Sequence, residues 1–130
     1  YMSEGQETIS VIEKIVKKVK PDIVFIPSRH DIHQDHRAVH NASLVAVRLI
    51  DEVYIYQAPS TTLWFQPNVY FDITDFIKTK IKAVRIHTTQ WGKVYMAERA
   101  VEGLAEYRAF DIFRNDRYME AFEVFRIVNK

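Results

Sequence analysis

The stretch PDIVFIPSRHDIHQDH, residues 21–36, joins a short apolar run to a polar segment rich in histidine. The apolar run lies between two prolines and is mostly β-branched, which is typical of a strand buried on both faces of a parallel sheet. The polar segment, residues 28–35, leads into a helical stripe of apolar and small residues. A strand, loop and helix in this order form a βα unit, and in open α/β sheets ligands bind at loops that leave the carboxyl ends of strands.

Helices and strands are predicted to alternate along the rest of the chain. Apolar periodicity and breaking residues predict helices over residues 6–19, 39–50, 74–87 and 94–108. Strands are predicted over residues 22–26, 53–56, 68–73 and 120–128. Thr74 is the expected N-cap of the third helix. Residues 57–67 lack periodicity but contain Trp64 and Phe65, so we expect either a rim loop or a contact surface.

Composition favours one globular domain over residues 1–130. Hydrophobic residues make up 48% of the 130 residues, and only three Gly and four Pro are present. The formal net charge of +1 gives no reason to expect nucleic acid or an anionic membrane as partner. No apolar run is long enough to cross a bilayer. Cysteine is absent, so any metal must be held by His, Asp or Glu, and a cytoplasmic location is expected.

Metal-ligand residue types are concentrated in one place. His30, His33 and His36 fall within seven residues, together with Asp31 and Asp35. A catalytic zinc site commonly has three such ligands and keeps a fourth position open for chemistry. The cluster therefore makes a zinc-dependent hydrolase one candidate function.

The same residues have a purely structural interpretation. In an arbitrary His-x-x-His segment at a helix start, an exposed loop is the more common outcome, with Asp31 or Asp35 accepting hydrogen bonds from helix N–H groups. His36 and His40 have the spacing of a helical metal pair, but the Glu that follows the first His in zincins is absent. Spacing alone leaves the two interpretations open.

Residues 21–36 resemble the second signature of the LmbE-like, or PIG-L-like, family of zinc-dependent N-acetylglucosaminyl deacetylases. That signature is a strand after Pro-Asp, followed by Asp-x-His-x-Asp-His. Gln34 stands where the family often has Pro. Residues 82–90 are similar to the family's Lys-x-Ala-x-x-x-His-x-Ser-Gln segment, and residues 118–124 to its closing Ala-Glu-Ala-Phe segment. Three matches in order make the resemblance much more specific than the histidines alone.

The resemblance implies roles for individual residues. His36 would be a zinc ligand, and His33 would act as an acid or stabilise the oxyanion. Asp35 would orient His33, and Asp31 is a weaker candidate that would lie behind the metal ligands rather than on the metal. Thr89-Gln90 and Glu120, in the other two matches, would support the pocket or its packing.

The family's first signature, His-Pro-Asp-Asp, does not occur in this sequence. It supplies two further ligands and the general base in the family. The resemblance therefore implies that the chain is the C-terminal portion of a deacetylase domain, with the remaining zinc ligands on a segment outside it. The alternatives are ligands from another chain, or a lost activity. The implied fold is a Rossmann-like, three-layer α/β fold with a mostly parallel sheet, incomplete at its N-terminus.

The function implied by the resemblance is zinc-dependent removal of an N-acetyl group from an amino sugar or an N-acetylglucosamine-containing conjugate. The substrate would be a small molecule. The competing hypothesis is a non-catalytic fragment or degenerate homologue that acts in assembly, through unpaired sheet edges and residues 57–67. A homo-oligomer is compatible with both.

Overall fold

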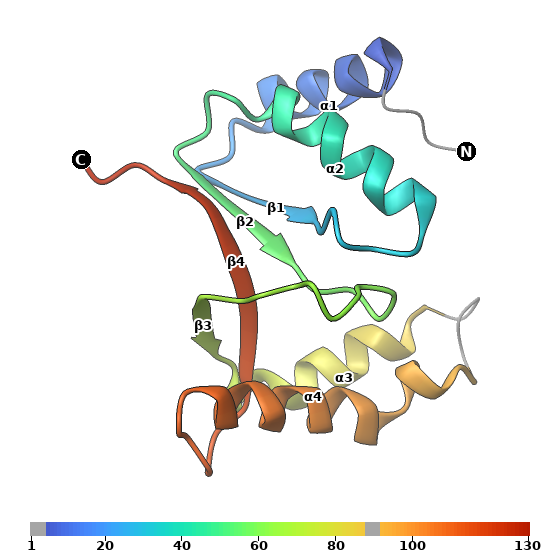
Figure 1. The fold of residues 1–130 in the computed structure, drawn as a ribbon, viewed down its shortest axis with the longest axis vertical. Coiled ribbons are helices and arrows are strands. Elements are labelled where there is room, and N and C mark those ends of the chain that lie inside the picture. The colour runs from blue at the N-terminus through green and yellow to red at the C-terminus, as the bar shows by residue number, and fades with distance from the viewer. Residues whose placement is uncertain (1–4, 88–91) are drawn as a thin grey trace. The chain divides into compact units, whose positions relative to one another are not determined.

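The computed structural model describes residues 5–87 and 92–130, and within them a four-stranded sheet has the order β1-β2-β4-β3 (Figure 1). The strands are β1 (Ile23–Pro27), β2 (Glu52–Tyr56), β3 (Val69–Asp72) and β4 (Met119–Ile127). The helices are α1 (Gln6–Val19), α2 (Gln34–Ala46), α3 (Ile77–Arg85) and α4 (Glu98–Asp111), with 3₁₀ turns η1 (Thr74–Phe76) and η3 (Val94–Met96). The expected succession of elements is confirmed.

The sheet mixes strand directions. β1 pairs with β2 in parallel, whereas β2 pairs with β4 in the antiparallel direction. The fold is thus α/β, as expected, but a mostly parallel, Rossmann-like sheet is not confirmed. The alternation in residues 120–128 predicts a strand with one buried face, and that pattern does not encode the direction of the neighbouring strand.

The chain divides into two compact units. One consists of Tyr1–Val69 and Phe122–Lys130, and the other of Tyr70–Ala121. Each unit is described separately below. The expectation of a single domain over residues 1–130 stays a prediction.

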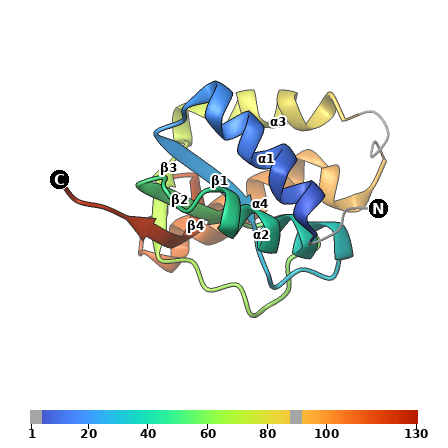
Figure 2. The same ribbon diagram turned by 90° about the horizontal axis from the view of Figure 1, so that it is seen from above.

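In the first unit, α1 and α2 lie side by side over β1 and β2 (Figures 1 and 2). Its core combines one helix, two strands and a loop through buried Ile26, Val47, Val53, Ile55 and Phe65. Phe65 belongs to the non-periodic residues 57–67, so this loop is anchored in the core rather than detached from it. Burial of an aromatic side chain of this size contributes about 1.5–3 kcal/mol.

The boundaries of α1 follow from its sequence. Lys20 adopts a left-handed conformation (φ 52°), and its N–H donates to the carbonyl of Val16. This closes the last turn just before Pro21, which cannot continue a helix. The helix predicted over residues 6–19 is therefore confirmed.

In the second unit, α3 and α4 pack through Ile77, Ile81 and Ala105. The expectation that Thr74 caps one helix reaching residue 87 is wrong. Thr74 opens the turn η1, and its Oγ accepts a hydrogen bond from the Tyr118 N–H at 3.0 Å. Its hydroxyl therefore joins the segment before β4 instead of the helix, which begins at Ile77 and ends at Arg85.

Across residues 5–87 and 92–130, none of the helices combines the length and the apolar character that a membrane span requires.

Candidate functional site

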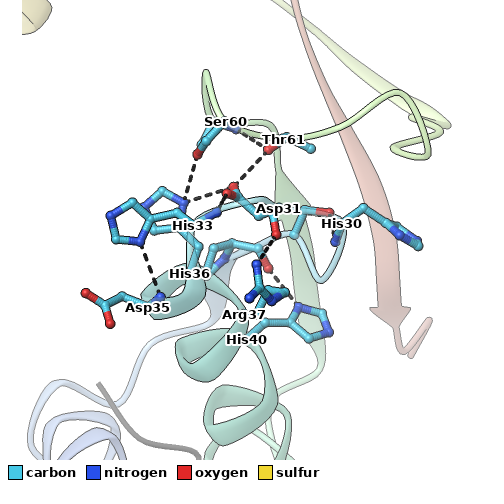
Figure 3. A network of polar contacts seen from close by, with 12 residues as sticks. His30, Asp31, His33, Asp35, His36, Arg37, His40, Ser60 and Thr61 are labelled. Atoms are coloured by element: carbon cyan, nitrogen blue, oxygen red, sulfur yellow. Dashed lines mark hydrogen bonds and ion pairs between the residues drawn. The ribbon is translucent and has the colours of Figure 1, made fainter. Parts of the chain in front are cut away.

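The candidate site is formed by two segments that follow neighbouring parallel strands (Figure 3). Residues 28–33 connect β1 to α2, and residues 57–62 follow β2. Because parallel strands end at the same edge of a sheet, the segments meet, and Asp31 and Thr61 form an isolated antiparallel bridge. The Ile32 N–H donates to the Ser60 carbonyl at 3.2 Å, and the Thr62 N–H donates to the His30 carbonyl at 2.7 Å. The site thus rests on backbone pairing as well as on side chains.

Asp31 is the centre of the hydrogen-bond network. Its side chain is fully buried, whereas that of His36 is 34% exposed. One carboxylate oxygen, Oδ1, accepts the His33 backbone N–H at 2.8 Å, and the other, Oδ2, lies 2.9 Å from His36 Nδ1. Arg37 Nη1 donates to the Asp31 carbonyl at 2.6 Å. These contacts hold the start of α2 against the segment that follows β1.

Asp31 is ionised at neutral pH. Burial alone would raise the pKa of Asp31, but hydrogen bonds from His36, the His33 amide and Ser60 outweigh burial and hold this pKa below the ordinary value of 3.8. An ionised carboxylate can only accept hydrogen bonds. Its partners must therefore be donors.

This requirement fixes the proton on His36. Because Asp31 only accepts, the hydrogen between the two residues belongs to His36 Nδ1. In the neutral ring the second nitrogen, Nε2, then carries the lone pair. A histidine held by a carboxylate on one nitrogen with the other nitrogen free is the usual arrangement of a metal-binding imidazole.

His33 carries its hydrogen on the other ring nitrogen. It is the N-cap of α2, and its Nδ1 accepts the Asp35 backbone N–H at 3.2 Å. A neutral His33 therefore carries its hydrogen on Nε2, where it can be donated to a ligand. The rings of His33 and His36 are stacked, with centroids 4.8 Å apart and an interplanar angle of 20°. One ring thus offers a lone pair and its neighbour offers a hydrogen.

Asp35 contacts His33 through its backbone, and in Figure 3 its carboxylate points away from the two stacked rings. The expected role of that carboxylate in orienting His33 stays a prediction. Asp31, the weaker candidate from the sequence, has the direct side-chain contact with a ring nitrogen.

His40 serves the fold. It is 3% exposed, and its Nδ1 lies 2.7 Å from the Pro27 carbonyl, to which it must donate. This hydrogen bond joins α2 to the end of β1. Burial lowers the pKa of His40 below its ordinary value of 6.5, although the bond to Pro27 opposes that shift.

Acidification should therefore destabilise the protein through His40. Its pKa is lower in the folded than in the unfolded state, so below about pH 6.5 the unfolded chain binds more protons and the free energy of unfolding falls with pH. One such group contributes a slope of at most about 1.4 kcal/mol per pH unit. In urea unfolding between pH 8 and 5, the His40→Gln variant should show a shallower fall than the wild type. Equal slopes would contradict this role, since the other histidines are common to both proteins.

A model of the family described as PIG-L, GlcNAc-PI de-N-acetylase, matches residues 1–47, which include the site segment before α2 and the whole of α2. An Escherichia coli (strain K12) protein named uncharacterized deacetylase YaiS is 37% identical over 87 residues, which are 62% of this chain and 47% of that protein. The chain is thus similar to the PIG-L family over its first 47 residues. It spans about half the length of this curated relative.

Two solved structures share the fold of this chain. The conserved protein TT1542 from Thermus thermophilus has a TM-score of 0.83 at 20% identity, covering 99% of this chain and 63% of that one. GalB, the 4-carboxy-2-hydroxymuconate hydratase from Pseudomonas putida KT2440, has a TM-score of 0.73 at 16% identity, with 97% and 62% covered. At these identities the likeness concerns the fold alone.

Of the other two PIG-L-like segments, residues 82–90 belong to the second unit, and residues 118–124 are divided between the two units. His87 is exposed just after α3, and Thr89-Gln90 fall outside the described residues. Glu120 forms an ion pair with Lys80 Nζ at 2.9 Å.

Sequence reasoning missed Arg37, Ser60 and Thr61. The Ser60 Oγ is 3.4 Å from His36 Nδ1, and the Thr61 Oγ donates to Asp31 Oδ2 at 3.3 Å. No motif marks the two hydroxyls, because they lie on another loop, 24 and 30 residues away from their partners. The one available signal was that this loop follows the neighbouring strand.

The site offers one ligand for a zinc ion. Imidazole nitrogen suits zinc, and His36 Nε2 is oriented and free of the hydrogen. Within residues 5–87 and 92–130, no group of three or more His, Cys, Asp or Glu side chains is placed to hold an ion. The described residues thus account for one ligand and not for a three-ligand site.

Proposed function

We propose that the full-length protein is a zinc-dependent hydrolase that removes the N-acetyl group of an amino sugar or an N-acetylglucosamine-containing conjugate. The observation that carries the proposal is that the two stacked rings carry their hydrogens on different nitrogens. His36 presents a lone pair and His33 presents a hydrogen, both fixed by hydrogen bonds to their Nδ1 atoms. Amide hydrolysis needs both a metal ligand and a donor to the oxygen that becomes negative.

In this proposal His36 Nε2 is one zinc ligand, and the other ligands come from residues outside this chain. Zinc bound there would supply a Lewis acid for the acetamide carbonyl. Asp31 would keep the hydrogen on His36 Nδ1 and so keep Nε2 available. The stacking of His33 on His36 places its own Nε2 next to the same region.

His33 would act on the substrate. In the neutral ring the Nε2 hydrogen can form a hydrogen bond to the carbonyl oxygen as negative charge develops. To pass a proton to the departing nitrogen as the C–N bond breaks, the ring would first have to be an imidazolium, with Nδ1 also protonated. A water molecule would supply the oxygen that bonds to the acetyl carbon, and the products would be acetate and a free amine. A proton delivered to the nitrogen at this step allows it to leave as a neutral amine, which is a better leaving group than an amide anion.

The acetylated amino sugar is supported by the family's description, GlcNAc-PI de-N-acetylase, and the deacetylase chemistry also by the name of the Escherichia coli relative. The structural likenesses do not choose the chemistry, since one of them is a hydratase. Substrate and reaction therefore have to be tested directly.

The test is acetate release by the full-length, zinc-loaded protein from a panel of N-acetylglucosamine derivatives. We expect stoichiometric acetate and free amine. Addition of water to 4-carboxy-2-hydroxymuconate without acetate release would favour a hydratase instead. Neither activity, together with no bound zinc, would favour the non-catalytic hypothesis.

Asp31→Asn should weaken zinc binding by roughly 10- to 100-fold, the usual cost of losing the carboxylate behind a histidine ligand. The Asn amide can donate to His36 Nδ1, and this stabilises the form that carries the hydrogen on Nε2. Competition with a chromophoric chelator measures the zinc affinity. Asp35→Asn is the matched control, because its carboxylate points away from the rings, and it should change the affinity much less (Figure 3). A larger loss in the control would contradict the assignment of Asp31.

A further inference from the structure

We propose that Thr61 is a positioning residue for His36: its hydroxyl fixes the Asp31 carboxylate, and that carboxylate fixes which ring nitrogen of His36 is free. The inference rests on the proposed function only where it concerns zinc. Its structural part, the choice of the His36 tautomer, concerns the metal-free protein.

Both hydrogen-bonding capacities of the Thr61 hydroxyl are used (Figure 3). Its oxygen accepts the Ala58 N–H at 2.9 Å, and the Thr61 N–H donates back to the Ala58 carbonyl at 3.0 Å. With an N–H pointing at the oxygen, the hydroxyl hydrogen is left for Asp31 Oδ2, 3.3 Å away. The turn from Ala58 to Thr61 thus aims a donor at the buried carboxylate.

The backbone keeps this donor in place. Residue 61 forms the bridge with residue 31, and the flanking bonds from Ile32 to Ser60 and from Thr62 to His30 prevent either strand segment from sliding. Farther along the loop, Phe65 is buried in the core of the first unit. The loop therefore acts as a fixed support for Asp31 rather than as a free rim.

Thr61 matters because Asp31 Oδ2 is shared. The same oxygen accepts from His36 Nδ1 and from Thr61, while Oδ1 accepts the His33 N–H. Without the Thr61 donor the carboxylate can rotate away from His36 Nδ1. Ser60 Oγ, 3.4 Å from the same nitrogen, could then become its partner. A hydroxyl can donate or accept, so Ser60 would support either tautomer of His36.

The chain offers a matched control in the next residue. Thr62 Oγ is buried and has no hydrogen-bond partner among residues 5–87 and 92–130. Thr61→Val and Thr62→Val remove one hydroxyl each, from adjacent residues of one loop, at nearly constant volume. Only the first removes a hydrogen bond to Asp31. Thr61→Ser restores the hydroxyl and serves as the conservative variant.

The decisive readout is the tautomer of His36 in the metal-free, full-length protein, at a pH where the ring is neutral. Proton–nitrogen NMR correlations distinguish a hydrogen on Nδ1 from one on Nε2. We expect a single Nδ1–H form in the wild type, Thr61→Ser and Thr62→Val, and a mixture in Thr61→Val. An unchanged Nδ1–H form in folded Thr61→Val would overturn the proposal. If that variant does not fold, the wild type still decides: a slowly exchanging Thr61 hydroxyl proton is expected, and a freely exchanging one contradicts the contact.

Zinc affinity gives a second readout. Thr61→Val should bind zinc about tenfold more weakly than the wild type, less than the loss for Asp31 itself, whereas Thr62→Val should bind it normally. A tautomer change without any zinc binding in the wild type would retain the positioning of His36 and reject the metal function. Normal zinc binding and an unchanged His36 tautomer in Thr61→Val would retain the metal function and reject the positioning role of Thr61.

Discussion

His36→Ala should abolish zinc binding at this site and reduce acetate release by more than about 100-fold, since a ligand must matter more than the carboxylate behind it. Neither of the neighbouring histidines on α2 is placed to substitute. A neutral His33 carries its hydrogen on Nε2, because its Nδ1 caps α2, and His40 is buried against the Pro27 carbonyl. Zinc content by metal analysis and acetate release, both on the full-length protein, measure the effect.

The control is His30→Ala, which removes an imidazole from the same loop. In Figure 3 the His30 ring points away from the stacked pair, and the contact of His30 with Thr62 uses its backbone carbonyl. This variant should keep its zinc and most of its activity. Full activity in His36→Ala would remove the mechanism proposed here, and loss in both variants would indicate a folding defect rather than a ligand.

His33→Ala should lower kcat by about 10²- to 10⁴-fold, the range for loss of a positioned acid or oxyanion donor. Zinc should still bind, because the Asp31 side chain and the free nitrogen of His36 do not depend on the His33 ring. The Asp31 contact with residue 33 runs through the backbone N–H, which Ala retains. Steady-state kinetics together with zinc content separate this defect from the loss of a ligand.

A second substitution separates capping from chemistry at His33. The His33 ring also caps α2, so part of any loss in His33→Ala could come from fraying of that helix. His33→Asn restores a good N-cap without the titratable ring. If the ring acts on the substrate, His33→Asn should be as inactive as His33→Ala but more stable to urea. Recovered activity in His33→Asn would assign His33 to structure alone.

Much of the first unit could be predicted from local patterns. The apolar stripe of residues 9–19 and the stop at Pro21 predict α1, and the apolar run before Pro27 predicts β1. These signals lie within one element. The direction of a strand is not encoded within one element. The antiparallel pairing of β4 with β2 depends on contacts between residues about 70 positions apart. Thr74 was misassigned for the same reason, because its partner Tyr118 is 44 residues away.

The candidate site shows the same division. The spacing of His33 and His36 allows both rings to point into one pocket at the start of α2, and they are stacked there. The partner of each Nδ1 was not predictable. A motif gives residue types in order, but it does not say that Asp31 would contact the ring of His36 or that Thr61 would hold that carboxylate. Those contacts arise where two parallel strands end together.

Zinc binding by His36 Nε2, with Asp31 holding Nδ1, underlies every step of the proposed mechanism. The most direct measurement is an anomalous difference map at the zinc absorption edge from crystals of the zinc-loaded, full-length protein. We expect one peak at about 2.0–2.1 Å from His36 Nε2, the usual zinc–imidazole distance, with the Asp31 contact to Nδ1 preserved. A peak bound to His33, or zinc bound with His36 outside its coordination sphere, would contradict this assignment.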